Sequence, residues 1–363
     1  MTSDATSPAI NTVLGPVSPS ELGVTLVHEH LLINLTAQQG ALPRETQLRA
    51  LADAKVELSN LYLVRRAPML NRDNALVTDI AVAVDEARQF ADLGGETIVD
   101  VTLPDIGRDA GALQAIARRT GLNVIAACGH YTHLVHPTNL EDEAAEAIAE
   151  RFVDEIVNGI GNTKVKPGLI GEIGTSDPIH PREAKVLRAA ARAHRQTGLP
   201  ISIHMHPASR LGHEVLDILE SEGVNPNRVV LGHVDLALGH ADLVFESALN
   251  YLRDLAKRGC YVGCDTFGKE TAILNWLGGA AFWCPSDRDR MRAIAQLVEE
   301  GFGGQILISH DTSLKYTLTR YGGWGFAHIL RTIAPNFESF GLDDQTFQLL
   351  LVDNPATMLT PAT

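Results

Sequence analysis

The sequence predicts an α/β fold, a (β/α)8 barrel with a metal site at the C-terminal ends of its strands. Three observations predict it: short β-branched runs alternate with longer amphipathic stretches, this unit recurs eight times in 363 residues, and several runs end in histidine or a carboxylate. Repeated strand–helix units are typical of parallel βαβ pairing. A barrel of this kind takes about 250 residues and tolerates insertions.

The eight strand candidates fill the chain from Val24 onward. They are 24–30, 97–103, 123–130, 168–174, 200–206, 228–235, 260–266 and 305–311. Stretches with helical spacing of apolar residues lie between them, at 79–93, 141–157, 182–197, 214–222, 243–257 and 287–300. Several of these are followed by a glycine, namely Gly94, Gly198, Gly223, Gly259 and Gly301. Glycine in that place favours a left-handed helix end.

A doubly wound sheet is the alternative architecture. It would need a glycine-rich turn after the first strand, but that strand ends in His28-Glu29-His30. We therefore expect one barrel domain over residues 1–363, with a short N-terminal lead-in at 1–22. Two segments, 42–71 and 267–285, are too long for plain loops. Because both follow strands, we expect these inserts at the active face.

Composition limits the partners. There are 30 Lys and Arg against 44 Asp and Glu, a formal net charge of −14. Phosphate binding needs a basic patch, so neither nucleic acid nor a membrane is expected, and the partner should be a small-molecule substrate. Residues 1–18 do not resemble a secretory leader, and no apolar run is long enough to span a bilayer. Four cysteines without CxxC spacing predict buried, reduced thiols and a cytoplasmic protein.

Six polar residues lie near the ends of five predicted strands. They are His28 and His30, Glu172, His204, His233 and Asp311. A lone buried histidine is more often a hydrogen-bonded core residue, but this many buried titratable groups are costly without a cation among them. Imidazole with carboxylate suits Zn²⁺ and neighbouring first-row ions such as Co²⁺, Mn²⁺ or Fe²⁺. Six ligands exceed the three that one catalytic zinc needs, so we expect two divalent ions sharing a carboxylate.

The motifs around these residues resemble the phosphotriesterase-related branch of the amidohydrolase superfamily. The resemblance runs from about residue 12 to the C-terminus. Its segments are Thr12–Pro16, Leu22–His30, Gly107–Asp109, Gly171–Ser176, Ile201–His204, Leu231–His233, Cys264–Lys269 and Ile308–Asp311. It implies a (β/α)8 barrel with a binuclear centre that hydrolyses esters, lactones, amides or organophosphate esters. Family precedent also implies a homodimer.

The resemblance implies a role for each ligand. His28, His30 and Asp311 would hold the more buried metal, and His204 and His233 the more exposed one. Asp311 would also take the proton of a hydroxide that bridges the metals and attacks the substrate carbonyl. Tyr131 matches a tyrosine that lactonases of the branch keep near the metals, where it would orient the substrate or donate to the leaving oxygen.

Two features depart from the best-known members. They bridge the metals with a carboxylated lysine on strand four, but the strand at 168–174 has no lysine at its end, and Glu172 is the substitute. Glu172 falls one residue beyond the lysine position, so a bulge or a small shift is needed to aim it inward. After strand seven, lactonases carry an Arg-Tyr pair where this chain has Thr266-Phe267.

Three functions stay open at this stage. The leading one is a binuclear metal hydrolase of a carboxylic ester, lactone or amide, with phosphotriesters at most a side activity. The second is a deaminase-like enzyme with one metal on the same barrel. The third is a metal-binding barrel without catalysis.

Overall fold

The computed structural model describes residues 9–39, 45–240, 242–273 and 282–362. Eight strands form one sheet of parallel neighbours in the order β14-β11-β10-β9-β8-β7-β6-β3. They are β3 (Thr25–Glu29), β6 (Thr97–Asp100), β7 (Asn123–Cys128), β8 (Leu169–Gly174), β9 (Ile201–His204), β10 (Val229–Gly232), β11 (Tyr261–Cys264) and β14 (Ile306–Ile308). The edge strands β14 and β3 approach each other, so the sheet is nearly closed. The predicted (β/α)8 barrel is confirmed, and the doubly wound sheet is excluded.

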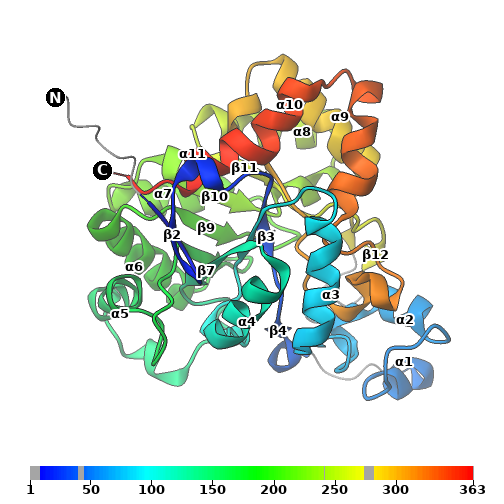
Figure 1. Ribbon diagram of the computed structural model, residues 1–363, viewed down its shortest axis with the longest axis horizontal. Helices are drawn as coiled ribbons and strands as arrows, with labels where there is room; N and C mark the ends of the chain where they lie inside the picture. Colours follow the sequence, from blue (N-terminus) through cyan, green and yellow to red (C-terminus); the bar gives the residue numbers. More distant parts are fainter. Residues whose placement is uncertain (1–8, 40–44, 241, 274–281, 363) are drawn as a thin grey trace.

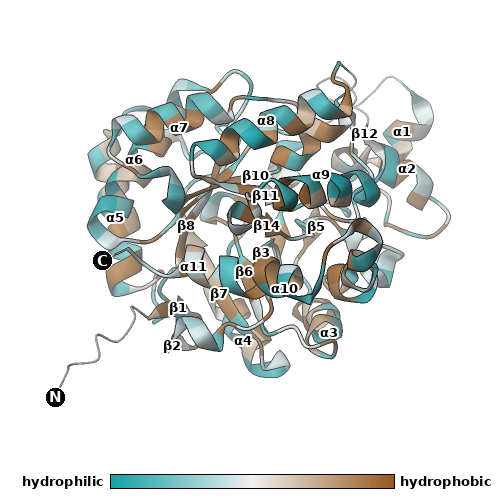
Figure 2. Cartoon of the chain, turned by 90° about the horizontal axis from the view of Figure 1, so that it is seen from above, coloured by the Kyte–Doolittle hydropathy of each residue, from teal (hydrophilic) through white to brown (hydrophobic). Residues whose placement is uncertain are grey.

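Helices surround this sheet and turn their apolar faces toward it (Figures 1 and 2). The helices that connect successive strands are α3 (Ile80–Ala91), α4 (Ala110–Thr120), α5 (Ala145–Asn158), α6 (Pro181–Thr197), α7 (Gly212–Ser221), α8 (Phe245–Lys257) and α9 (Asp287–Glu299). After β14 come π-helical turns at Ile329–Ile333 and Leu349–Asp353, with α10 (Asp344–Gln348) and α11 (Asn354–Leu359). Figure 2 shows the brown strands inside a ring of helices whose outer faces are teal.

The strands end earlier than the apolar pattern predicts. Ladder pairing stops at Glu29, Gly232 and Ile308, whereas the predicted strands continue through His30, Asp235 and Asp311. His30, His233 and Asp311 therefore lie just beyond their strands rather than within them. At these positions the backbone leaves the ladder, so that its side chains are turned toward the mouth of the barrel.

The inserts add small elements at one end of the barrel. The first contains α1 (Thr46–Leu51) and α2 (Leu61–Arg66), and the second contributes the hairpin β12 (Ala272–Ile273) and β13 (Phe282–Trp283). Figure 1 places α1, α2 and β12 on the same side of the molecule, and α2 contacts β12. Residues 42–44 of the first predicted insert and 274–281 of the second lie outside the described residues.

The rest of the chain supports this frame. A hairpin of β1 (Ile10–Thr12) and β2 (Gly15–Val17) precedes the barrel, and a second one pairs β4 (Ile33–Asn34) with β5 (Leu76–Val77). All four cysteines are buried and free, as predicted. Among the described helices, none is long and apolar enough to cross a membrane. The single-domain organisation of residues 1–363 stays a prediction.

Candidate metal centre

The structure brings the six predicted residues together at the C-terminal ends of the strands. We call His28, His30, Glu172, His204, His233 and Asp311 the strand-end cluster. Two overlapping groups within it offer ligand atoms that all lie within 4.8 Å of one another: His28, His30 and Asp311 form one, and His28, Glu172 and His233 the other. Five of the six residues are buried, and Asp311 is the most accessible member.

Glu172 lies at the centre of the cluster. Its Oε2 is 3.2 Å from His28 Nε2, 3.0 Å from His204 Nδ1 and 3.7 Å from His233 Nε2. The other carboxylate oxygen, Oε1, is 3.3 Å from His30 Nε2. One carboxylate thus faces all four imidazoles. A carboxylate that bridges two metal ions would have this position.

A backbone irregularity aims Glu172 inward. The register between β8 and β9 shifts between Ile170 and Ile173, which agrees with the bulge or small shift predicted for this strand. Gly171 makes it possible, because its φ is +116° and a Cβ there would lie 2.0 Å from the Ser202 carbonyl oxygen. Only glycine fits such a position.

The ring of His30 is held so that one nitrogen is left for a cation. The Thr102 hydroxyl donates to the Leu32 carbonyl oxygen at 3.0 Å, so His30 Nδ1 must donate to that hydroxyl, 2.8 Å away. His30 Nε2 then points at two carboxylates, 3.3 Å from both Glu172 and Asp311. Metal-ligating histidines are typically oriented in this way through the other ring nitrogen.

Asp265 faces two more histidines. Its Oδ1 accepts from His233 Nδ1 and from the His233 backbone N–H, both at 2.8 Å. Its Oδ2 is 3.3 Å from His28 Nδ1 but makes no hydrogen bond among the described residues. Both nitrogens of the buried His28 ring likewise have no hydrogen-bond partner in the described chain. Buried polar atoms of this kind need a partner, and a ligated cation would supply one.

Two cluster residues carry strained backbone. His233 has φ +62° and Asp311 has φ +49°, and no other non-glycine residue in the described part has positive φ. Left-handed conformations cost free energy for such residues and gather at functional sites. Both side chains line the pocket, and His233 Nε2 lies 3.7 Å from Glu172.

The histidines and carboxylates of the cluster shift one another's pKa values. Burial lowers the pKa of His30, but hydrogen bonds with Asp311 and Glu172 outweigh it and raise that pKa to about 10. Burial would raise the pKa of Glu172 and of Asp311, yet neighbouring histidines and, for Asp311, Lys269 hold both pKa values below their ordinary range. Without a metal ion, protonated histidines balance the negative charge of these carboxylates. Divalent ions bound to neutral histidines would balance it more effectively. The donor set fits the metals that the sequence predicts.

Tyr131 reaches the cluster from the loop after β7. Its hydroxyl lies 3.1 Å from His204 Nε2 and 3.2 Å from Nδ1. Asp105 accepts from the Tyr131 backbone N–H at 3.0 Å, and His136 Nε2 donates to the Tyr131 carbonyl oxygen at 2.7 Å. Burial raises the pKa of Tyr131 well above its ordinary value, and Glu172 and Asp311 add to this effect. Tyr131 therefore remains a protonated phenol.

The loop after β11 brings a lysine to Asp311. The Lys269 ammonium contacts Asp311 Oδ2. Arg290, fully buried on α9, holds this loop: its guanidinium donates to the Lys269 carbonyl oxygen at 3.0 Å and the Thr266 hydroxyl at 2.8 Å. It also donates to Asp235 at 2.7 Å, Asp287 at 2.8 Å and the Pro285 carbonyl oxygen at 2.9 Å.

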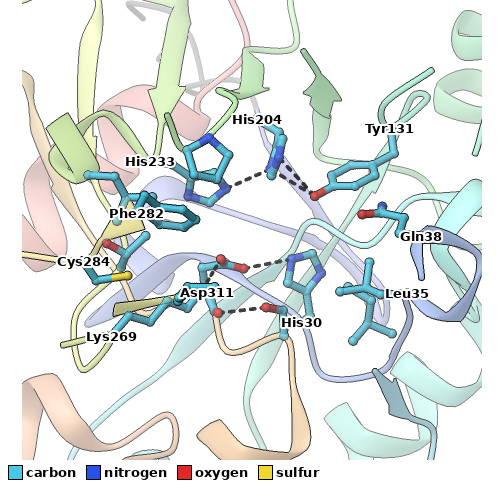
Figure 3. A pocket seen from close by; sticks show the side chains of 16 residues that line it. His30, Leu35, Gln38, Tyr131, His204, His233, Lys269, Phe282, Cys284 and Asp311 are labelled. Carbon is cyan, nitrogen blue, oxygen red and sulfur yellow. Dashed lines mark hydrogen bonds and ion pairs between the residues drawn. The ribbon is translucent and has the colours of Figure 1, made fainter. Parts of the chain in front are cut away.

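A pocket opens beside the cluster (Figure 3), and its space together with the open solvent at its mouth is about 520 Å³. Figure 3 shows His204 and His233 along one side, Lys269 with Asp311 along another, and Tyr131 with Gln38 across from them. Lys269 is the one lysine or arginine among the described lining residues, and apolar side chains such as Leu35 and Phe282 fill much of the wall. The space suits a small molecule with an apolar part.

Sequence reasoning found the cluster and Tyr131 but missed other contributors. Gln38, Asp105 and Arg290 have no motif that separates them from surface polar residues. His310, next to Asp311 in the chain, pairs with the buried Glu29 at 2.7 Å.

A barrel with a histidine–carboxylate cluster at its strand ends is typical of one class of protein, the (β/α)8 barrels with a candidate metal site at the active face. Within this class, the chain belongs to the phosphotriesterase family, whose model matches residues 8–359. The family predicted from the motifs is therefore confirmed. Its curated relatives and structural neighbours include hydrolases, which supports an enzyme.

Several relatives cover almost the whole chain. The N-acetyltaurine hydrolase of Xenopus tropicalis is 35% identical over 352 residues, 97% of each chain, and that of Homo sapiens is 32% identical with the same coverage. Among solved structures, a resiniferatoxin-binding protein from Rhodobacter sphaeroides has TM-score 0.91 and 37% identity, covering 97% of this chain and 95% of that one. A lactonase from Listeria monocytogenes has TM-score 0.76 and 26% identity, covering 98% and 100%.

Proposed function

We propose that this protein is a metal-dependent hydrolase that cleaves the amide bond of a small N-acyl compound. In this proposal the strand-end cluster holds two divalent ions, with zinc as the first candidate. The observation that carries it is the position of Glu172, whose carboxylate faces all four histidines of the cluster. A deaminase-like centre with a single metal would not need one carboxylate that faces four histidines.

The relatives favour an amide over the other carbonyl substrates. Curated N-acetyltaurine hydrolases are 32–35% identical over 97% or more of this chain, whereas the lactonase is 26% identical. The pocket agrees with a small substrate that has an apolar part. A lactone stays the second candidate because Tyr131 matches the tyrosine of the lactonases.

Each ion would be held by the residues that face it. His28, His30 and Asp311 would hold one, His204 and His233 the other, and Glu172 would bridge them. When bound, such ions lower the pKa of water to about 7 and polarise a carbonyl oxygen.

The side chains around the ions would orient the substrate and move protons. Asp311 lines the pocket, and Lys269 helps to keep it ionised, so its carboxylate can accept a proton. Tyr131, which stays protonated, can donate a hydrogen bond to a substrate oxygen or nitrogen. Asp265 is not among the described residues that line the pocket, and it keeps the ring of His233 in place.

A hydrolysis panel tests this proposal. The zinc-loaded protein is incubated with N-acetyltaurine, a γ-lactone, an aryl ester, an aryl phosphotriester and an amino-substituted heterocycle such as cytosine, and acetate, ring opening, phenol and ammonia are measured. We expect release of acetate and taurine from N-acetyltaurine, with little phosphotriester cleavage. Lactone opening without amide cleavage would overturn the amide assignment. Ammonia release would favour a deaminase, and no turnover of any compound would favour a binding protein.

A further inference from the structure

The pocket contains one buried polar atom that the chain itself leaves without a partner. Gln38 ends the helical turn Thr36–Gln38, lines the pocket and is only 5% exposed. Its Nε2 has no hydrogen-bond partner among the described residues. No other described residue of the lining has such an atom. A buried amide without an acceptor costs free energy, so a native protein keeps one where something else binds it.

The surroundings of Gln38 form a wall of uncharged donors. Figure 3 shows its carboxamide beside the Tyr131 ring, with Leu35 below it. The Tyr131 hydroxyl and the Gln38 amide N–H are both uncharged hydrogen-bond donors. Lys269, across the pocket, is already paired with Asp311.

We propose that Gln38 binds the substrate, and that it recognises an acceptor oxygen outside the bond that is cut. The inference rests on the proposed amide hydrolysis and deepens it. The scissile carbonyl belongs at the cluster, and the Tyr131 hydroxyl, which contacts His204, lies on the cluster side of Gln38. In an N-acetyl amide the acyl side is a methyl group, so a further oxygen must lie on the amine side. A sulfonate and a carboxylate share this acceptor chemistry.

Gln39 offers a matched control in the adjacent position. Its Nε2 donates to the Leu70 carbonyl oxygen at 3.0 Å, and it is not among the residues that line the pocket. Gln38→Met and Gln39→Met make the same change in shape and polarity. Gln38→Met removes a donor that has no partner in the described chain. Gln39→Met removes a donor whose partner is the Leu70 carbonyl oxygen.

The kinetic test uses three amides that differ only at the far end of the amine: N-acetyltaurine, N-acetyl-β-alanine and N-propylacetamide. For the sulfonate or the carboxylate substrate, Gln38→Met should raise KM about 10- to 100-fold, as loss of a hydrogen bond to a charged group does, with kcat within about twofold. N-propylacetamide, which has no acceptor there, should be cleaved alike by both proteins. Which charged substrate responds identifies the acceptor. An equal effect on all three amides, or none on any, would overturn the proposal.

Stability and ligand binding separate this proposal from the proposed function. Gln38→Met should unfold at the same temperature as the wild type or higher, because it removes a buried donor without a partner, and Gln39→Met should unfold lower. Ethanesulfonate or propionate should raise the unfolding temperature of the zinc-loaded wild type and of Gln39→Met, but not of Gln38→Met. Loss of stability in Gln38→Met, or no response of the wild type to either anion, would contradict the role of Gln38. These unfolding temperatures test the role of Gln38 even if no amide is hydrolysed. Absence of hydrolysis would refute only the proposed reaction.

Discussion

Single residues at this site derive their roles from what they face. The Glu172 carboxylate faces four imidazoles, His30 has one ring nitrogen engaged by Thr102, and Asp265 holds His233 through both its ring and its backbone. Each of these contacts leaves a ligand atom directed at the same small volume. The chemistry therefore depends on the orientation of the side chains as much as on their identity.

Removing the shared carboxylate should lower the metal content. Glu172→Ala takes away the one group that faces all four histidines, so we expect the bound metal to fall from two ions per chain to one or fewer, with the fold retained. Elemental analysis after dialysis measures the ratio, and circular dichroism checks the fold. Glu150→Ala, an exposed glutamate on α5, is the control. Two ions retained in Glu172→Ala would mean that this carboxylate is no bridge.

The sequence predicts these residues because each stands next to an apolar run that ends in a polar motif. Gln38 and Arg290 have no such signal. Gln38 stands in a short polar stretch that is typical of a surface loop, and Arg290 in a run of alternating Asp and Arg that is typical of an exposed helix start. Their burial comes from tertiary contacts, which periodicity does not show.

At the scale of elements, short loops after the strands carry the site and buried ion pairs hold them. The apolar runs locate all eight strands but overestimate their ends, because residues past the ladder are as buried as those within it. The bulge in β8 was predictable from the place of Glu172, whereas the early exits after β10 and β14 were not. They depend on left-handed backbone at His233 and Asp311, which is rare for these residue types.

The loop after β11 should depend on Arg290. Arg290→Met leaves Asp235 and Asp287 buried without their cation, so we expect a loss of about 3–5 kcal/mol in the free energy of unfolding. Urea unfolding measures it. Arg292→Met on the same helix removes a half-exposed pair with Asp289, 3.5 Å away, and should cost at most about 1 kcal/mol. Equal losses in the two variants would show that the buried network does not hold the loop.

Glu183 should make stability depend on acid pH. Its carboxylate accepts from the backbone N–H groups of His133, Ser176 and His180, each at 2.9 Å, and from the Ser176 hydroxyl at 2.6 Å. Burial raises the pKa of Glu183, but these hydrogen bonds prevail and hold it below its ordinary 4.5. A lowered pKa adds stability that is present above pH 4.5 and is lost as the pH falls through the folded value.

Glu183→Gln tests this dependence. At pH 7 the variant should be about 1–3 kcal/mol less stable than the wild type, because an amide cannot accept all these bonds. The difference should shrink as the pH falls below 4.5, because the unfolded wild-type chain then takes up a proton that the folded carboxylate, with its lowered pKa, resists. Urea unfolding of both proteins at pH 7 and pH 4 gives the two values. A difference that does not change with pH would contradict the assignment.

At the scale of the whole molecule, the barrel gathers ligands from five strands that are far apart in sequence. His28 and Asp311 are separated by 282 intervening residues yet belong to one candidate ligand group. The sequence predicts that these distant residues meet, because eight similar strand–helix units can close into a barrel. It does not predict the pocket, whose walls come from loops and inserts. The homodimer expected from the family stays a prediction, and light scattering would decide it by a mass twice that of the chain.

The central claim is that the strand-end cluster binds two metal ions that activity requires. The most direct measurement is a titration of the metal-free protein with Zn²⁺, in which bound metal and hydrolysis of N-acetyltaurine are followed together. We predict that both rise in parallel and level off at two ions per chain, and that Asp311→Asn abolishes hydrolysis without unfolding the protein. Full activity at one ion per chain, or hydrolysis that persists without metal, would contradict the account.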